Sequence, residues 1–355
     1  MATEAAGLTT PPGGPVEDGH PQGAPPPLEV RGIRFAPALI CAPMAGISHA
    51  PFRRLVADCG GCGGFFTEML PARWLLSPNA IPSPAVIRRP HEGPVVYQVL
   101  VGDPELAAPV VRRLLPLEPA GIDLNCACPA PVARSAGAGG TLFGDRDRLA
   151  RVLAAMRSAF PGLLSVKIRL GDAADGWEDR LLDRLRLFED LGVDLVTLHP
   201  RFTGDRWNRR PRNEWYDVVA ASTRLPIIAS GNLVGPASLQ AHPDHFRRVA
   251  GLMIGRMAAI QPWVFTAWGH PFDPPPALEV WDRFCAYVLE DYGPDQGLWR
   301  IKAWAPYYAQ NFLFGHTLAT IGRSARDLPT LIRRAREFLA ADPVRVRHPS
   351  LDIEK

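Results

Sequence analysis

Short apolar runs alternate with longer amphipathic stretches through most of the chain. Eight of these runs have the length and apolar character of buried strands: Ala38–Ala42, Gly64–Phe66, Val95–Val99, Gly121–Leu124, Leu164–Ile168, Asp194–Leu198, Ile227–Ala229 and Gly251–Ile254. Between them, apolar residues recur with helical spacing in stretches about long enough for crossover helices: Pro104–Leu115, Asp145–Phe160, Glu178–Leu191, Asn213–Ser222 and Pro236–His242. The pattern therefore predicts repeated units of a strand followed by a helix.

The number and spacing of these units predict the architecture. Eight strand-then-helix units over about 220 residues match the size of a (β/α)8 barrel, the TIM barrel. A doubly wound parallel sheet is the alternative, but its Gly-x-Gly-x-x-Gly motif is missing after the first predicted strand. We predict an α/β protein built on a TIM barrel.

The two ends of the chain have a different pattern. Residues 1–27 repeat Pro and Gly with almost no large apolar side chains, so they cannot bury enough surface to offset the entropy of ordering. After Pro271 the run Phe-Asp-Pro-Pro-Pro interrupts regular structure, and three helical patterns follow: Leu278–Tyr292, Leu298–Phe312 and Leu328–Leu339. The predicted domains are a disordered tail (1–30), a barrel (31–271) and a C-terminal helical bundle (277–355).

Charge is distributed unevenly along the 355 residues. The net charge of +3 does not by itself indicate a nucleic-acid partner, but residues 298–347 contain nine Arg or Lys and three Asp or Glu. The C-terminal bundle is therefore a basic module beside a more neutral barrel. Because the chain has six cysteines, no charged-then-apolar leader and no transmembrane run, we expect a cytoplasmic protein without a membrane partner. We also expect a monomer.

The cysteine spacing raises the question of a metal site. Cys59 and Cys62 form a C-x-x-C pair, which together with Cys126 and Cys128 would supply four thiolates for zinc. The first pair, however, lies among glycines after a helical pattern, and the need for small residues in a turn is enough to explain cysteines there. We therefore predict no metal.

Polar residues follow nearly every predicted strand. In a barrel the carboxyl ends of the strands share one cavity, where catalysis takes place. The residues at these ends are Ala42-Pro43-Met44-Ala45-Gly46, Thr67-Glu68, Gln98, Asn125 with Cys128, Lys167 with Arg169, His199 with Arg201, Ser230-Gly231-Asn232 and Gly255-Arg256. Such a set indicates a binding site rather than a purely structural barrel.

The residue types in this set suit one ligand. Gly231 and Gly255 follow strands seven and eight, where barrels commonly bind phosphate, and Arg256 adds a charge-assisted contact. Amide and basic side chains that suit an electron-rich ring come from other strand ends: Gln98, Asn125, Lys167 and His199. The arrangement resembles an FMN site.

Several motifs in order along the chain extend this resemblance to a family. They are Ala-Pro-Met-Ala-Gly (42–46), Gln-Val-Leu-Val-Gly (98–102), Asp-Leu-Asn-Cys-Ala-Cys-Pro (123–129), Val-Lys-Ile-Arg-Leu-Gly (166–171), Leu-His-Pro-Arg (198–201) and Met-Ile-Gly-Arg (253–256). As a set, from Ala38 to about Pro343, the chain resembles the tRNA-dihydrouridine synthases. In that family NADPH reduces FMN, the flavin transfers hydride to C6 of a uridine in tRNA, and a cysteine protonates C5.

The resemblance implies roles for individual residues. Cys128 corresponds to the proton donor, because it alone precedes Pro129, and Cys126 is interpreted as structural. Asn125 corresponds to a flavin or uracil contact. The implied FMN contacts are Pro43, Met44, Gln98, Lys167, His199, Ser230, Gly231, Asn232, Gly255 and Arg256.

Four positions depart from the family pattern. Ala127 and Pro200 replace glycines, Ser230 replaces an asparagine, and Ala250 stands where aspartate is common. The Ala127 change requires a backbone conformation that a Cβ atom tolerates.

A uridine inside folded tRNA must be extracted, and contacts to phosphates offset that cost. The basic module and the loop after the sixth strand supply the predicted RNA contacts: Arg201, Arg206, Arg300, Lys302, Arg326, Arg333 and Arg334. A solvated basic face is the alternative for these arginines. Residues 297–304 and the terminal Asp352-Ile-Glu-Lys resemble most the bacterial tRNA-dihydrouridine synthase C branch, which modifies position 16 of the D-loop.

The resulting hypothesis is an FMN-dependent, NADPH-reduced enzyme that converts uridine to dihydrouridine in tRNA. An oxidoreductase of free pyrimidines, of the dihydroorotate dehydrogenase type, is the alternative enzyme, but a small pyrimidine needs no basic helical module. A tRNA-binding chaperone without catalysis is the alternative from another class, and the presence of Cys128 and Lys167 opposes it.

Overall fold

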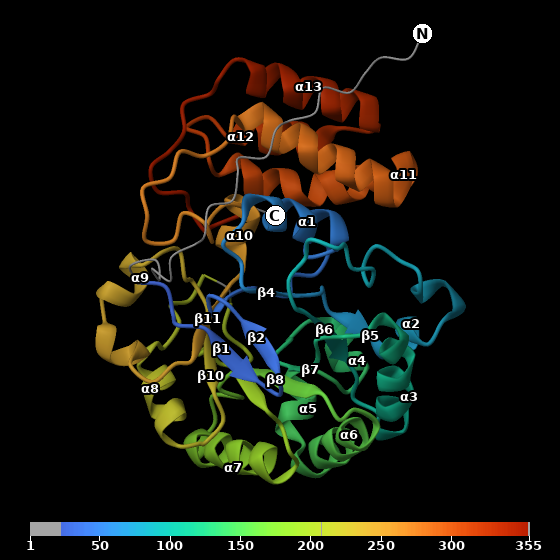
Figure 1. Ribbon diagram of the computed structural model, residues 1–355, viewed down its shortest axis with the longest axis vertical. Coiled ribbons are helices and arrows are strands. Elements are labelled where there is room, and N and C mark those ends of the chain that lie inside the picture. Colours follow the sequence, from blue (N-terminus) through green and yellow to red (C-terminus); the bar gives the residue numbers. More distant parts are fainter. Residues whose placement is uncertain (1–22, 207, 354–355) are drawn as a thin grey trace.

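Eight parallel strands form a closed barrel at the centre of the computed structural model, which describes residues 23–206 and 208–353 (Figure 1). The strands are β3 (Leu39–Cys41), β4 (Gly64–Phe66), β6 (Val95–Leu100), β7 (Gly121–Cys126), β8 (Leu163–Ile168), β9 (Leu195–Leu198), β10 (Ile227–Ser230) and β11 (Gly251–Ile254). Each pairs with the next, and β11 pairs with β3 to close the ring. All eight predicted strands are present, so the predicted TIM barrel is confirmed.

Helices surround the barrel because their apolar faces cover the outer faces of the strands (Figure 1). The longer ones are α1 (Ala50–Cys59), α3 (Pro104–Leu114), α6 (Arg146–Ala159), α7 (Trp177–Asp190) and α8 (Glu214–Ala221). Local sequence sets where they begin. The carboxylates of Asp103 and Asp145 accept hydrogen bonds from backbone N–H groups in the first turns of α3 and α6, which caps both helices.

Short elements complete the barrel loops. They are β5 (Leu70–Pro71), α2 (Ala72–Leu75), η1 (Pro78–Ala80), η2 (Leu115–Leu117), α4 (Pro131–Ser135), α5 (Gly140–Gly144), α9 (Ala237–Gln240), η3 (Pro243–Phe246) and α10 (Arg256–Ile260). In the described part of the chain, no helix is long and apolar enough to cross a membrane.

A hairpin of β1 (Leu28–Val30) and β2 (Ile33–Phe35) lies against the amino-terminal end of the barrel. Its apolar side chains pack on the barrel interior, including Leu163 and Leu195, the first residues of β8 and β9. The hairpin begins at Leu28, within residues 1–30 that were predicted as a tail. The remainder of that tail, residues 1–22, lies outside the described residues.

Three C-terminal helices form a bundle (Figure 1): α11 (Ala277–Ala309), α12 (His316–Ser324) and α13 (Leu328–Ala340). Of these, α11 packs against α1. Two predicted helices form the two halves of α11, which breaks at Gly293 with a φ of 67°. The α12 helix was not predicted. Trp281, Trp304 and Tyr308 stack in the bundle core, with 4.6 Å between the ring centroids of the last two. The Trp304 indole N–H donates to the Ala259 carbonyl at 2.8 Å, which joins the bundle to the barrel.

Candidate active site

A cavity of about 160 Å³ lies at the carboxyl ends of the strands. Nine of the ten predicted cofactor contacts line it: Pro43, Met44, Lys167, His199, Ser230, Gly231, Asn232, Gly255 and Arg256. Gln98, the tenth, is not among the lining residues. The strand ends β3, β8, β9, β10 and β11 therefore bring together residues that are more than 200 positions apart in sequence.

The lining of this cavity is basic. Lys167, Arg201 and Arg256 contribute to it, and within the described chain no Asp or Glu lines it. Lys167 is 8% exposed, and burial together with the neighbouring Arg169 lowers its pKa to about 8. Buried positive charge is costly when no negative charge lies beside it, so a cavity of this composition suits an anionic group.

His199 is neutral and has a defined tautomer. Burial and the surrounding cations, Lys167 first among them, hold its pKa well below the usual range. Arg201 Nη1 lies 2.5 Å from His199 Nε2. A guanidinium only donates hydrogen bonds, so Nε2 must accept and the ring proton must reside on Nδ1. Arg201 therefore orients the histidine.

Arg201, which was predicted to contact RNA, is 1% exposed and makes its hydrogen bonds within the protein. Its Nε donates to the Arg209 carbonyl at 2.6 Å, and its Nη2 donates to Asn232 Oδ1 at 3.1 Å. Arg256 donates to the same Asn232 oxygen and, at 2.8 Å, to the Leu351 carbonyl. The two arginines thus hold the loop after β10 in place.

Gly231 is required by both conformation and space. Its φ is +124°, a backbone conformation that residues other than glycine rarely adopt. A Cβ atom there would lie 2.7 Å from Cδ2 of His199. The glycine therefore lets the loop after β10 approach the histidine.

Asn125 anchors the loop that carries Cys128. Its Oδ1 accepts hydrogen bonds from the backbone N–H of Ala127 at 3.0 Å and of Cys128 at 2.9 Å. Ala127 is not among the described residues with positive φ, so its Cβ atom causes no backbone strain. Cys126 is 1% exposed, and burial raises the pKa of its thiol well above the usual range, whereas Cys128 is partly exposed.

Behind Asn125 runs a buried chain of hydrogen bonds. Asn125 Nδ2 donates to Gln98 Oε1 at 2.8 Å, and Gln98 Nε2 donates to Asp123 Oδ2 at 2.8 Å. Ser165 Oγ donates to Asp123 Oδ1 at 2.6 Å. Since an ionised carboxylate only accepts, Asp123 determines which end of each amide faces its neighbour and so how Asn125 presents its oxygen to the Cys128 loop.

Asp123 was not proposed as a site residue from sequence. Burial raises the pKa of its carboxyl from 3.8 to about 6, although the hydrogen bonds from Ser165 and Gln98 act in the opposite direction and lower it. The available signal was an acidic residue inside an otherwise apolar strand, a position that is costly unless it is hydrogen-bonded.

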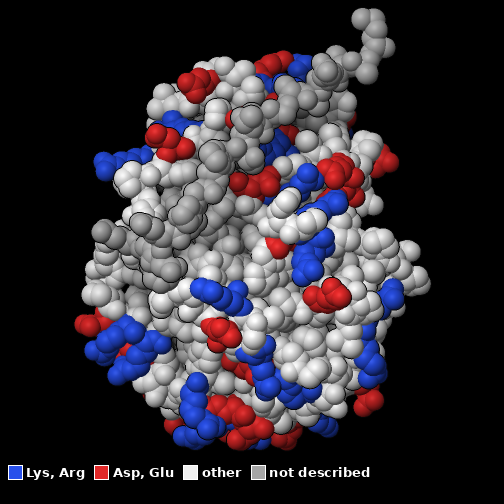
Figure 2. Space-filling model, in the orientation of Figure 1, with Lys and Arg blue, Asp and Glu red and all other residues white. Residues whose placement is uncertain are grey.

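The remaining predicted RNA contacts lie in different environments. Arg206, Arg326, Arg333 and Arg334 are exposed, and Arg333 pairs with Glu337 at 2.8 Å. Lys302 Nζ donates to the Ala325 carbonyl at 2.6 Å, and Arg300 lies 3.6 Å from Glu68. Figure 2 shows Lys and Arg interspersed with Asp and Glu over one face of the molecule. The basic side chains visible on that face do not form one uninterrupted patch.

No group of three or more His, Cys, Asp or Glu side chains that could hold a metal ion occurs within the described ranges. The zinc arrangement considered from the cysteine spacing therefore finds no support in residues 23–206 and 208–353.

The fold and the site define a TIM-barrel enzyme with a basic cavity at the strand ends and a partly exposed thiol on the loop after β7. Comparison with solved structures agrees on the fold. The old yellow enzyme from Trypanosoma cruzi superposes with a TM-score of 0.53 at 10% identity, covering 75% of this chain and 97% of that one. Morphinone reductase in complex with tetrahydroNAD gives 0.50 at 11% identity, covering 73% and 93%.

Sequence comparison identifies the family. The profile described as "Dihydrouridine synthase (Dus)" matches residues 40–334. The chain is similar to tRNA-dihydrouridine synthase B of Escherichia coli (strain K12), with 29% identity over 310 residues covering 82% of this chain and 94% of that protein. The Yersinia pestis protein of the same name is 28% identical, covering 86% and 98%. The chain belongs to the dihydrouridine synthase family, which confirms the predicted family and enzyme class. The C branch is not supported, because these relatives carry the B name.

Proposed function

We propose that this protein binds FMN, accepts reducing equivalents from NADPH, and converts a D-loop uridine of tRNA to 5,6-dihydrouridine, with Cys128 protonating C5. The observation that carries the proposal is the convergence of nine predicted cofactor contacts on one basic cavity, beside a loop that presents Cys128. Membership of the dihydrouridine synthase family supports the same reaction.

The residues at the barrel mouth fit FMN. A flavin mononucleotide combines an anionic phosphate with a ring that carries amide-type donors and acceptors. Arg256 and the glycine loops after β10 and β11 suit the phosphate, and Lys167 suits the electron-rich part of the ring. When bound, the flavin supplies the hydride.

Cys128 is the proton donor in this proposal, because its backbone N–H is held by Asn125 while its side chain keeps partial exposure. A thiol at this place can give its proton to a carbon that gains electron density and can be reset by solvent. Lys167 and Cys128 lie close enough to influence each other electrostatically, so a positive charge lies near the sulfur that gives up its proton.

The RNA is held by the helical domain and by the loop after β9. Arg206, Arg326 and Arg334 are exposed and can contact phosphates without losing a buried partner. Phosphate contacts of this kind offset the cost of extracting a stacked uridine.

The test is product formation on unmodified tRNA. Purified protein is expected to carry flavin absorbance, and with NADPH it should add two hydrogens to one D-loop uridine, as mapped by mass spectrometry of nuclease fragments. Protein without flavin, or activity on orotate or free uracil with none on tRNA, would contradict the proposal. The same fragments identify which D-loop uridine is modified.

A further inference from the structure

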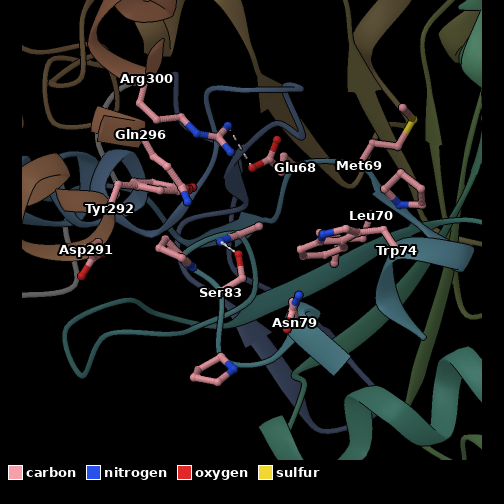
Figure 3. Close-up of a pocket in the computed structure, with 14 residues that line it drawn as sticks. Glu68, Met69, Leu70, Trp74, Asn79, Ser83, Asp291, Tyr292, Gln296 and Arg300 are labelled. Carbon is pink, nitrogen blue, oxygen red and sulfur yellow. Dashed lines mark hydrogen bonds and ion pairs between the residues drawn. The ribbon is translucent and has the colours of Figure 1, made fainter. Parts of the chain in front are cut away.

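A second cavity, of about 640 Å³, lies between the barrel and the helical domain (Figure 3). Its walls come from the segment after β4, from α2, from residues 79–85 and from α11. It shares no lining residue with the cavity around Lys167 and His199, and Cys128 does not line it. It is therefore distinct from the place where a uridine meets the thiol.

Two aromatic side chains lie on opposite sides of this cavity (Figure 3): Trp74 from α2 and Tyr292 from α11. The Tyr292 ring is held by an edge contact with His49, with 5.3 Å between centroids, and by the Arg300 guanidinium 4.7 Å from its centroid. Proteins stack unpaired nucleobases on aromatic rings and on guanidinium planes of this kind.

One end of the cavity combines a carboxylate with a guanidinium. Glu68 Oε2 accepts a hydrogen bond from Gly46 N–H at 2.8 Å, and Glu68 Oε1 lies 3.6 Å from Arg300 Nη1. In the described residues, Glu68 Oε1 and Tyr292 Oη are buried without a hydrogen-bond partner. Leaving such atoms without a hydrogen bond is unfavourable, and a ligand could supply one.

The neighbouring residues connect this cavity to the proposed reaction centre. Glu68 holds Gly46, which belongs to the same segment as Met44 of the flavin cavity. Met69 packs with Cys128 against the same small apolar cluster. Glu68 and Met69, which line the second cavity, thus connect it to the segment of Met44 and to the loop of Cys128.

We propose that this cavity binds a second, unpaired nucleobase of the RNA, near the uridine that reacts; the inference rests on the proposed tRNA substrate. A carboxylate beside a guanidinium complements an N–H beside a C=O, the arrangement on the pairing edge of guanine and uracil. A base from RNA is favoured over a base from the nicotinamide reductant. Tyr292, Gln296 and Arg300 belong to the helical domain, whose residues 298–347 carry the excess of positive charge.

The cavity is tested with Trp74→Ala, which removes one stacking wall, and with Trp74→Phe, which restores an aromatic ring. Gln296→Ala is a second variant, at an exposed lining position where misfolding is not expected. Phe314→Ala is the matched control, because Phe314 is 64% exposed and lies outside the cavity. Flavin content and the rate of flavin reduction by NADPH are measured for each protein.

Affinity for unmodified tRNA is then measured with intact transcripts and with transcripts that carry one abasic position in the D-loop. Trp74→Ala should bind intact tRNA roughly ten-fold more weakly, the loss typical of one stacked base, while Trp74→Phe and Phe314→Ala bind normally. One abasic position other than the target should weaken wild type by a similar factor and leave Trp74→Ala unaffected.

Equal tRNA affinity of wild type, Trp74→Ala and Gln296→Ala would overturn the inference. So would slower flavin reduction by NADPH with unchanged tRNA affinity, which would assign the cavity to the reductant. The proposed function is judged separately, because dihydrouridine formation by wild type in the same samples is independent of the Trp74 result.

Discussion

The barrel mouth and the helical domain both concentrate basic side chains, but in opposite physical settings. At the mouth Lys167 and Arg201 are buried at 8% and 1% exposure, and burial lowers the pKa of Arg201 to about 10. In the helical domain Arg326 and Arg334 are exposed to solvent. Buried cations are costly unless an anion accompanies them, whereas exposed ones cost little. In the proposed function, the mouth therefore binds the anionic part of the cofactor, and the exposed arginines of the helical domain attract the RNA.

Removing the space for that anion should have the largest effect. Gly231→Ala forces a side chain into a φ of +124° and against His199, so we expect loss of most bound flavin and a lower stability by roughly 1–3 kcal/mol. Flavin absorbance per protein and denaturant unfolding measure both. Gly204→Ala is the matched control, because a Cβ atom there meets nothing within 4 Å. Full flavin content in Gly231→Ala would contradict the assigned cavity.

The pH dependence of stability tests the protonation of Asp123 in the buried chain of hydrogen bonds. Its folded pKa of about 6 lies above its ordinary value of 3.8, so folding takes up a proton between these values. Relative to Asp123→Asn, wild type should therefore gain stability as pH falls from about 7 to 4, by roughly 3 kcal/mol, and lose that gain as pH rises again. Denaturant unfolding of both proteins across this range measures it. A difference that is independent of pH would show that the carboxyl does not titrate there.

The exposed arginines should have the smallest individual effects. Arg326→Ala or Arg334→Ala is expected to weaken tRNA binding a few-fold at low salt and to reduce the slope of log affinity against log salt by about one, with flavin content unchanged. Binding titrations at several salt concentrations measure this. An unchanged slope in both variants would show that these residues form the solvated face considered as the alternative.

The barrel was predictable because its buried parallel strands are short apolar runs, such as Gly251–Ile254, and its site was predictable because strand ends converge. Other features depend on tertiary contacts. The α12 helix was not predicted, although its buried residues Leu318 and Ile321 have helical spacing. Only the fold shows why Gly322 lies in it, because a Cβ atom there would come within 2.8 Å of Ala305. Arg201 follows a strand end like its neighbours, yet only the folded loop shows that it turns inward to His199.

The two neighbouring cysteines test the central claim most directly. Wild type, Cys128→Ala and Cys126→Ala are each incubated with NADPH and unmodified tRNA, and dihydrouridine is quantified. Cys128→Ala should retain flavin and bind tRNA but form product at least about 100-fold more slowly, as expected for loss of a general acid. Cys126→Ala, a substitution in the core cluster, should keep most of its activity. Undiminished turnover in Cys128→Ala would contradict the account.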